Sequence, residues 1–209
     1  ENNQRLSLAC ASVGFLSDNR SIHGMNPVLK NIKTRRSVRS YKNTPVPKEL
    51  IEKVIEAGNY APAGNNSQSW RFVVVTDTEM RGKLYNTAYA NWKRFFDNIK
   101  KNNPEHFETV KHYGEMKDPV YYEAPCVVFV IGTKAIDCAL VTENMMLAAH
   151  SLGLGSCYLY FGAQVLDNPE IVKALDLKEK EKIFGPVILG YADKFPDPPP
   201  KKAPSVKWV

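Results

Sequence analysis

The stretch APAGNNSQSWRFVVV, residues 61–75, places a polar loop directly before an apolar run that is typical of a buried strand. Seven small or polar residues lie between Pro62 and Trp70, and ordering such a loop costs conformational entropy unless something holds it. Asn66 and Gln68 carry carboxamides, which donate and accept hydrogen bonds and suit the alternating edge of a pyrimidine-like ring. The loop is therefore either a capped turn between helix and strand or half of a ligand cradle.

The sequence VPKELIEKVIEAG, which precedes this loop, has the periodicity of an amphipathic helix. Pro47 suits its first turn, and Gly58 suits its C-terminal cap. Four apolar side chains share one face of this predicted helix, namely Leu50, Ile51, Val54 and Ile55.

A second, long helix is predicted after the strand, over about residues 79–100, with Asp77 or Thr78 as its cap. Four aromatic residues recur in it at spacings of four, three and four, so they share one face: Tyr85, Tyr89, Trp92 and Phe96. Such a stripe usually packs on a core. The alternative is a substrate lid whose rings stack on planar molecules.

The rest of the chain alternates helical and strand patterns without an internal repeat. The expected elements are a looser polar segment at 101–118, a central strand at 124–132, a buried helix at 135–153 capped by Gly153, a short strand or loop at 156–160, a small helix opened by Pro169, a third strand at 183–192 and a proline-rich, extended tail. Periodicity by itself predicts an α/β fold with a parallel sheet, in one domain over residues 25–209.

Composition limits the classes of protein to which the chain can belong. With 209 residues, 44% apolar and 24% charged, it has a globular composition and no apolar run of 18 residues, so we expect no membrane-spanning helix. Its four cysteines lack C-x-x-C spacing, which argues against a metal site and favours a reducing, cytoplasmic compartment. Residues 1–24 are an extension of uncertain status.

The net charge of +6 is concentrated in KTRRSVRSYK, residues 33–42, and in the tail. Guanidinium groups bind phosphate bidentately, and a serine adds a neutral donor, so this motif suits an anionic cofactor. Binding of nucleic acid and a solvated basic turn are the alternatives.

Other motifs are excluded by their context. GLGSCY at Gly153 lacks the third glycine of a dinucleotide fingerprint and follows a helix, so we reject a Rossmann motif there. No nucleophile elbow, His-Glu-x-x-His helix or P-loop occurs, so a hydrolase with its own nucleophile finds no support.

Four ordered blocks of the sequence resemble the FMN-dependent nitroreductases. Arg35, Ser37 and Arg39 match the family's Arg-x-Ser-x-Arg, and APAGNNSQSW matches its Ala-Pro-Ser-x-x-Asn-x-Gln-Pro-Trp. ENMMLAAHSLGLGSCYL is similar to the family's core helix and the turn after it, and LGYADKFPDPPPKKAP to its Gly-Tyr-Pro strand end and basic tail. The resemblance spans about residues 26–209.

The resemblance implies a set of residues that bind FMN. Arg35 and Ser37 would hold the phosphate. Arg36 would lie beside the ribityl chain, and Arg39 would face the pyrimidine edge of the flavin. A tail lysine would complete the phosphate site, and the resemblance leaves open whether it is Lys201 or Lys202.

Two further groups would line the cofactor. The opening loop, commonly from the partner subunit in this family, would contribute Pro62, Ala63, Gly64, Asn66 and Gln68. The N5 side of the flavin, reached by a backbone N–H, would be lined by Tyr158, Leu159, Tyr160 and Phe161. Ala63 replaces the usual serine and removes a hydroxyl contact, and Ser69 replaces the usual proline and loosens the turn.

The family fold is α+β, a mixed, mostly antiparallel sheet flanked by helices, in an intertwined homodimer whose extended C-terminal tails wrap the partner. The resemblance thus replaces the parallel sheet that periodicity predicts. It implies electron transfer from NADH or NADPH through flavin N5 to a nitroaromatic or quinone, with ping-pong kinetics and no catalytic side chain.

Three other functions remain open at this stage. A reductive dehalogenase of the same fold, deiodinase-like, would hold an amino-acid zwitterion with a charged lid. Residues 79–100 show no match to that lid, although Lys93 and Arg94 keep this alternative open. A flavin-binding protein without turnover is the second alternative. A basic protein that binds nucleic acid is the third, and the absence of interleaved aromatic and basic residues argues against it.

Overall fold

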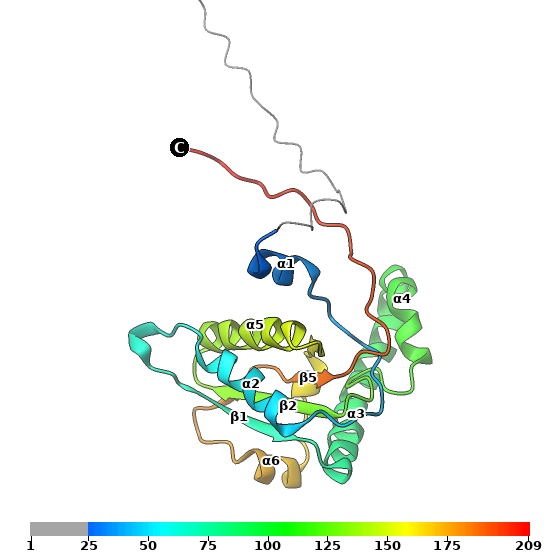
Figure 1. The fold of residues 1–209 in the computed structure, drawn as a ribbon. Coiled ribbons are helices and arrows are strands. Elements are labelled where there is room, and N and C mark those ends of the chain that lie inside the picture. Colours follow the sequence, from blue (N-terminus) through cyan, green and yellow to red (C-terminus); the bar gives the residue numbers. More distant parts are fainter. Residues whose placement is uncertain (1–24) are drawn as a thin grey trace, which may run out of the picture.

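The computed structural model describes residues 25–209, and the expected extension over residues 1–24 lies outside them. Its helices are α1 (Pro27–Thr34), α2 (Lys48–Asn59), α3 (Thr78–Asn102), α4 (Pro104–Val110), α5 (Ala135–Ser151) and α6 (Pro169–Leu175), with 3-10 turns η2 (Gly64–Asn66), η3 (Lys111–Glu115) and η4 (Phe161–Ala163). Its strands are β1 (Trp70–Val75), β2 (Cys126–Gly132), β3 (Gly155–Tyr158), β4 (Lys182–Ile183) and β5 (Val187–Gly190). The sheet forms a middle layer between α2 and α5 on one face and α3 and α6 on the other (Figure 1).

Every pairing between these strands is antiparallel. The order is β1-β2-β5-β3, and β4 also pairs with β2. The parallel sheet predicted from periodicity is therefore wrong, whereas the mostly antiparallel α+β fold implied by the resemblance is confirmed.

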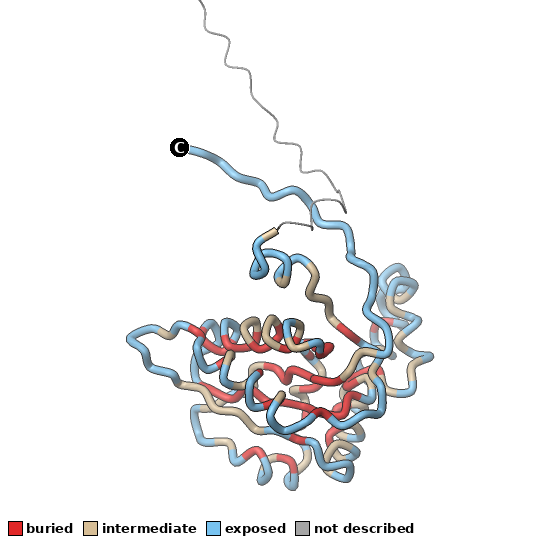
Figure 2. Tube along the Cα trace, in the orientation of Figure 1, coloured by how far each residue is buried: buried red, intermediate tan, exposed pale blue. Residues whose placement is uncertain are grey.

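Periodicity predicted parallel strands because of the pattern in β2, whose seven residues are all buried. Cys126, Val128 and Val130 pack in the core with α2 and α5. Val127, Phe129 and Ile131 pack in the core with α3 and α6. A continuous apolar run indicates that both faces of a strand are buried, which is common in parallel sheets. Here the sheet is antiparallel, and both of its faces are buried because helices cover them. Figure 2 shows this buried layer running through the middle of the molecule.

The predicted helix before the loop is confirmed as α2, but Gly58 is not its cap. Gly58 lies inside the last turn, and Tyr60 caps the helix. A Cβ on Gly58 would lie 2.6 Å from Met145 Cγ of α5, so the glycine permits the close approach of the two helices. At α5, Gly153 does follow the helix end, with a φ of +78°, and the Leu154 N–H donates to the Ala149 carbonyl at 2.8 Å, as in a Schellman motif.

Two further segments differ from expectation. The polar segment 101–118 contains α4, which begins at Pro104 and is capped by Asn103, whose side chain accepts from the His106 N–H at 3.1 Å. The strand expected over 183–192 is divided into β4 and β5. Pro186 has no N–H to donate to a ladder, and Gly185 adopts a φ of +122°, so pairing is interrupted between them.

Both ends of the described chain are poorly covered. No residue of α1 is buried, and its apolar side chains Val28, Leu29 and Ile32 are exposed. The tail after residue 192 has no regular secondary structure, and Trp208 is 91% exposed (Figure 2). Within residues 25–209, no helix is both long and apolar enough to cross a bilayer.

Candidate functional site

The segment after α1 runs beside β3, and this contact positions the basic motif. The Val38 N–H donates to the Ser156 carbonyl at 2.9 Å, and Ser37 forms a parallel bridge with Ser156. Val38 is fully buried against Gly155, where a Cβ would lie only 2.9 Å from a Val38 methyl carbon. Because successive side chains of extended backbone alternate, Ser37 and Arg39 project away from this core contact.

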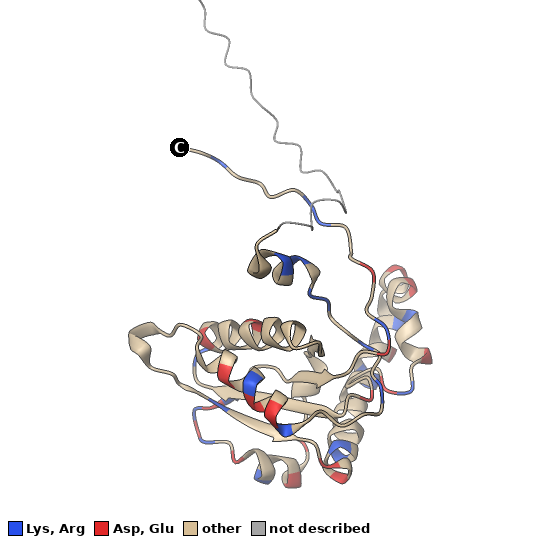
Figure 3. Ribbon diagram, viewed as in Figure 1, with Lys and Arg blue, Asp and Glu red and all other residues tan. Residues whose placement is uncertain are grey.

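The motif and the tail enclose a cavity of about 400 Å³, which we call the cationic cavity. It is lined by Arg35, Arg36, Ser37, Arg39, Pro196, Asp197, Pro199 and Lys201. Four side chains of this lining are cationic and one is a carboxylate, and Figure 3 shows basic residues along α1, the segment after it and the tail. Lys202, the other tail lysine considered from sequence, is not part of the lining.

One donor of the cationic cavity's lining, Arg35 Nε, has no hydrogen-bond partner. Arg35 Nε is buried without a hydrogen-bond partner and lies 3.6 Å from Glu143 Oε1, and Ser156 Oγ is also buried without one. Arg36, in contrast, donates through Nη1 to the backbone carbonyls of Lys33 and Arg35, both at 2.7 Å. A buried donor without a partner costs about 1–3 kcal/mol, so the wall at Arg35 suits an anionic acceptor.

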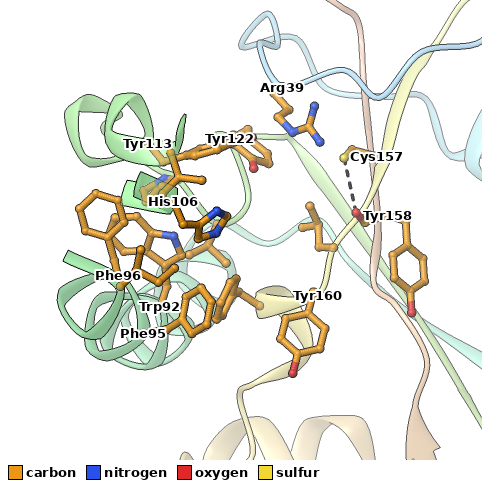
Figure 4. A pocket seen from close by; sticks show the side chains of 16 residues that line it. Arg39, Trp92, Phe95, Phe96, His106, Tyr113, Tyr122, Cys157, Tyr158 and Tyr160 are labelled. Carbon is orange, nitrogen blue, oxygen red and sulfur yellow. Dashed lines mark hydrogen bonds between the residues drawn. The ribbon is translucent and has the colours of Figure 1, made fainter. Parts of the chain in front are cut away.

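A second cavity of about 280 Å³, which we call the aromatic cavity, is shown in Figure 4 and shares Arg39 with the first. Its lining comes from α3, from α4 and the segment that follows it, and from the end of β3 with the turn after it. The residues are Trp92, Phe95, Phe96, Ile99, His106, Val110, Tyr113, Pro119, Val120, Tyr122, Cys157, Tyr158, Leu159, Tyr160 and Phe161, together with Arg39. Arg39 lines both cavities. The four residues of the turn proposed from sequence, 158–161, therefore lie on one wall with it.

Arg39 faces Tyr122 across the mouth of the aromatic cavity. The guanidinium carbon lies 5.8 Å from the centre of the Tyr122 ring, a cation–π distance. Burial raises the pKa of Tyr122 to about 12, so the phenol is neutral at physiological pH. The contact from Arg39 Nη1 to the Ser37 carbonyl is long, at 3.5 Å, so the guanidinium keeps donors for a ligand.

The loop that carries Tyr122 is fixed by a carboxylate. Asp118 accepts from the backbone N–H groups of Val120, Tyr121 and Glu123 at 2.8–3.0 Å. Tyr122 and Glu123 both adopt left-handed backbone, with φ of 56° and 55°, which costs about 1–2 kcal/mol per non-glycine residue. With this backbone conformation the two adjacent tyrosines point in different directions: Tyr121 packs in the core and Tyr122 lines the cavity.

The predicted aromatic stripe is divided by the fold. Its rings form a continuous ladder, with centroid distances of 5.3 Å, 5.4 Å and 4.7 Å along Tyr85, Tyr89, Trp92 and Phe96. All four side chains pack in or against the core, and Trp92 and Phe96 also line the aromatic cavity, whereas Tyr85 and Tyr89 lie outside its lining.

The loop at residues 61–69 lies away from both cavities. Ser67 contacts Lys134, beside the N-terminus of α5, whereas the basic motif lies near the C-terminus of that helix, and Figure 1 shows the two at opposite ends of α5. The structure therefore places one set of predicted ligands outside the cavities of its own chain, namely Pro62, Ala63, Gly64, Asn66 and Gln68. Asn65, Asn66 and Gln68 have φ of 55°, 52° and 41°, so the loop is strained as well as exposed.

Sequence reasoning missed one wall of the aromatic cavity, which comes from residues 104–122 and includes His106, Tyr113 and Tyr122. The Asn103-Pro104 pair was the available signal, because asparagine caps helices and proline favours their first position. Nothing in the pattern indicated that this helix would face the turn after β3. Among residues 25–209, no group of three His, Cys, Asp or Glu side chains is arranged to hold a metal ion.

Comparison with known proteins places this fold and these motifs in one class. The nitroreductase family model matches residues 32–191. A protein of Methanothermobacter thermautotrophicus named "Putative NADH dehydrogenase/NAD(P)H nitroreductase" is 32% identical over 180 residues, covering 81% of this chain and 79% of its own. The crystal structure of a nitroreductase with bound FMN from Bacteroides fragilis has a TM-score of 0.68 at 32% identity and covers 88% of this chain and 100% of its own.

The chain therefore belongs to the nitroreductase family. An iodotyrosine deiodinase of Thermotoga neapolitana is also similar, at 26% identity over 174 residues, which cover 81% of this chain and 89% of that protein. Family membership thus leaves more than one reaction to be considered.

Proposed function

We propose that the chain is an FMN-dependent oxidoreductase that passes electrons from NADH or NADPH to planar aromatic acceptors, such as nitroaromatics or quinones. The observation that carries the proposal is that Arg39 lines both a cationic cavity and an aromatic one. FMN has a phosphate at one end and a planar ring system at the other, so it matches the two adjoining environments in chemistry. The FMN bound by the Bacteroides fragilis relative supports the same assignment.

The residues present fit this cofactor. In the proposal, Arg35, Ser37 and Lys201 hold the phosphate, because all three line the cationic cavity and can donate hydrogen bonds to it, and Arg35 Nε has no hydrogen-bond partner. Arg36 lies beside the ribityl chain. Arg39 faces the pyrimidine edge, where a fixed positive charge stabilises negative charge that develops on reduction. Bound FMN supplies the redox chemistry itself, so the side chains bind, orient and exclude water.

We propose further that the site is completed in a homodimer. The loop at 61–69 is strained and exposed, and it lies at the far end of α5 from its own chain's cavities. α1 is eight residues long and has no buried residue, and such a short helix is marginal in water without a packing partner. A second copy that covers α1 and receives the tail accounts for both features and brings its own loop to the cofactor.

The buried free thiols of Cys126, Cys138 and Cys157 suit the reducing cytoplasm, where we place the protein.

The absorption spectrum of the purified protein tests this function. We expect flavin bands, release of FMN on heating, and bleaching of the bands when NADH or NADPH is added without oxygen. Addition of 4-nitrobenzyl alcohol should restore the bands, and initial rates should follow ping-pong kinetics. A colourless protein that does not bind added FMN would overturn the proposal.

The similarity to iodotyrosine deiodinase makes reductive dehalogenation the second candidate. A zwitterionic amino acid needs a carboxylate to pair with its ammonium group. Among residues 25–209, the lining of the aromatic cavity includes no aspartate, glutamate or lysine. We therefore favour acceptors without an amino-acid group. Iodide release from 3-iodotyrosine, measured beside nitro reduction by the same preparation, separates the two reactions.

A further inference from the structure

One polar side chain on the segment that sequence reasoning missed points into the aromatic cavity. His106, in the first turn of α4, extends its ring toward the open space between Trp92 and the turn at Tyr160 (Figure 4). The residue as a whole is exposed to solvent. The residue therefore connects the interior of the cavity with bulk water.

The ring is oriented by its own helix. The Thr109 hydroxyl donates to the His106 carbonyl at 2.7 Å, and the same oxygen lies 3.4 Å from His106 Nδ1. Because the hydroxyl hydrogen is used at the carbonyl, the Thr109 oxygen accepts from Nδ1–H. This arrangement leaves Nε2 as the ring nitrogen available to a molecule in the cavity.

The groups around His106 restrict what else can deliver a proton there. From α3 the cavity receives only apolar and indole side chains. The titratable or charged groups that face it from other elements are Arg39, Tyr113, Tyr122, Cys157, Tyr158 and Tyr160, and none is a carboxylate. Burial raises the pKa of the Cys157 thiol and of Tyr122, which keeps both protonated. His106 is the side chain in this lining whose ring nitrogens can both donate and accept a proton.

We propose that His106 binds an oxygen of the electron acceptor and donates the proton that its reduction consumes. The inference rests on the proposed function. For a nitroaromatic, one N–O bond breaks, and NAD(P)H is oxidised to NAD(P)+ as the nitro group is reduced to nitroso. The departing oxygen leaves as water, with one hydrogen from the reductant's hydride and one from the His106 imidazolium. The neutral imidazole recovers its proton from solvent on its exposed side.

The test separates proton-dependent from proton-independent electron transfer. The FMN-loaded protein is reduced with NADPH under anaerobic conditions and mixed with either 4-nitrobenzyl alcohol or ferricyanide, which accepts electrons without a proton. The variants are His106→Gln, which keeps a hydrogen-bond donor but does not titrate, and Thr109→Val, which removes the partner of Nδ1. His112→Gln is the matched control, because His112 is exposed on the same segment and lies outside the cavity lining.

We expect His106→Gln to slow reoxidation by the nitro compound by about 100-fold, the usual effect of losing a general acid, and to leave ferricyanide reoxidation within about twofold. Thr109→Val should show a smaller loss with the same selectivity, and His112→Gln no loss. Equal losses with both acceptors, or no loss, would overturn the inference. Failure of the wild type to bind FMN or to be bleached by NADPH would instead overturn the proposed function.

Discussion

The hydroxyl of Tyr121 donates a hydrogen bond to the carbonyl oxygen of Gly162 at 2.7 Å, and both groups are buried. Tyr121 precedes the residue that faces Arg39, and Gly162 lies in η4, directly after the turn that lines the aromatic cavity. One bond therefore joins two walls of the cavity that come from distant parts of the sequence. Gly162 is also tightly enclosed, since a Cβ there would lie 3.0 Å from Pro186.

Replacing Tyr121 by phenylalanine should lower the free energy of unfolding by about 1–3 kcal/mol, because the Gly162 carbonyl would stay buried without its partner. We also expect a higher KM for the acceptor, since η4 is no longer tied to the opposite wall. Tyr85→Phe is the control, because its hydroxyl reaches the Lys117 carbonyl at an exposed position. Urea unfolding measures the difference, and equal effects of the two variants would contradict this role of Tyr121.

The ion pair between Arg71 of β1 and Glu181, in the turn before β4, should make the free energy of unfolding depend on pH in the acid range. Arg71 holds Glu181 with two hydrogen bonds, at 2.9 Å and 2.6 Å, and this pairing lowers the pKa of Glu181 from 4.5 to about 2. A carboxylate with a lowered folded-state pKa stabilises the protein above its unfolded-state pKa, and that stabilisation is lost as pH falls through the folded value.

Glu181→Gln should therefore be less stable than the wild type at pH 7, by about 1–2 kcal/mol for lost charge-assisted hydrogen bonds. The difference should shrink between about pH 5 and pH 2 as the wild-type carboxyl is protonated. Glu179→Gln, at an exposed neighbouring position, supplies the control. Thermal unfolding over this pH range measures both variants, and a pH-independent difference would argue against the pairing.

Gly58→Ala and Gly82→Ala should change stability in opposite directions. Both glycines are helical, and alanine is favoured over glycine in a helix by about 1 kcal/mol. A Cβ at Gly58 would meet the buried Met145 at 2.6 Å, whereas a Cβ at Gly82 meets nothing within 4 Å. We expect a net destabilisation of about 1–2 kcal/mol at the first position, because overpacking exceeds the gain in propensity. Stabilisation by both substitutions in urea unfolding would mean that α2 and α5 can separate at little cost.

Lys201 and Lys202 are adjacent, but the structure includes only Lys201 in the lining of the cationic cavity. If the FMN phosphate binds there, Lys201→Gln should raise the Kd for FMN by about tenfold, the loss expected for one charge-assisted hydrogen bond. Lys202→Gln should leave the Kd within about twofold. Fluorescence titration of the apoprotein measures both. A larger rise in Kd for Lys202→Gln than for Lys201→Gln would mean that the tail of the holoprotein is shifted by one residue.

The sequence by itself determined most of the elements and the chemistry of the motifs. Apolar periodicity located α2, α3, α5 and β2, because burial of one or both faces imposes a repeat that any sequence must show. Capping residues located helix ends, as at Asp77, whose carboxylate accepts from the Met80 N–H at 2.8 Å. The resemblance carried by the ordered motifs then supplied the α+β class that periodicity could not.

Periodicity gave the wrong strand direction, and only the tertiary structure decided which strands pair and how the site is assembled. A buried strand shows the same pattern whether its neighbours run parallel or antiparallel, because periodicity records which side chains avoid water and not which backbone groups pair. Arg39, His106 and Tyr122 have unrelated surroundings in the sequence and meet around one cavity because α4 and the Asp118 loop pack opposite the turn after β3. Such contacts depend on the relative placement of distant elements, which no local pattern records. For the same reason, the whole predicted aromatic stripe packs on the core, but only Trp92 and Phe96 also reach the cavity.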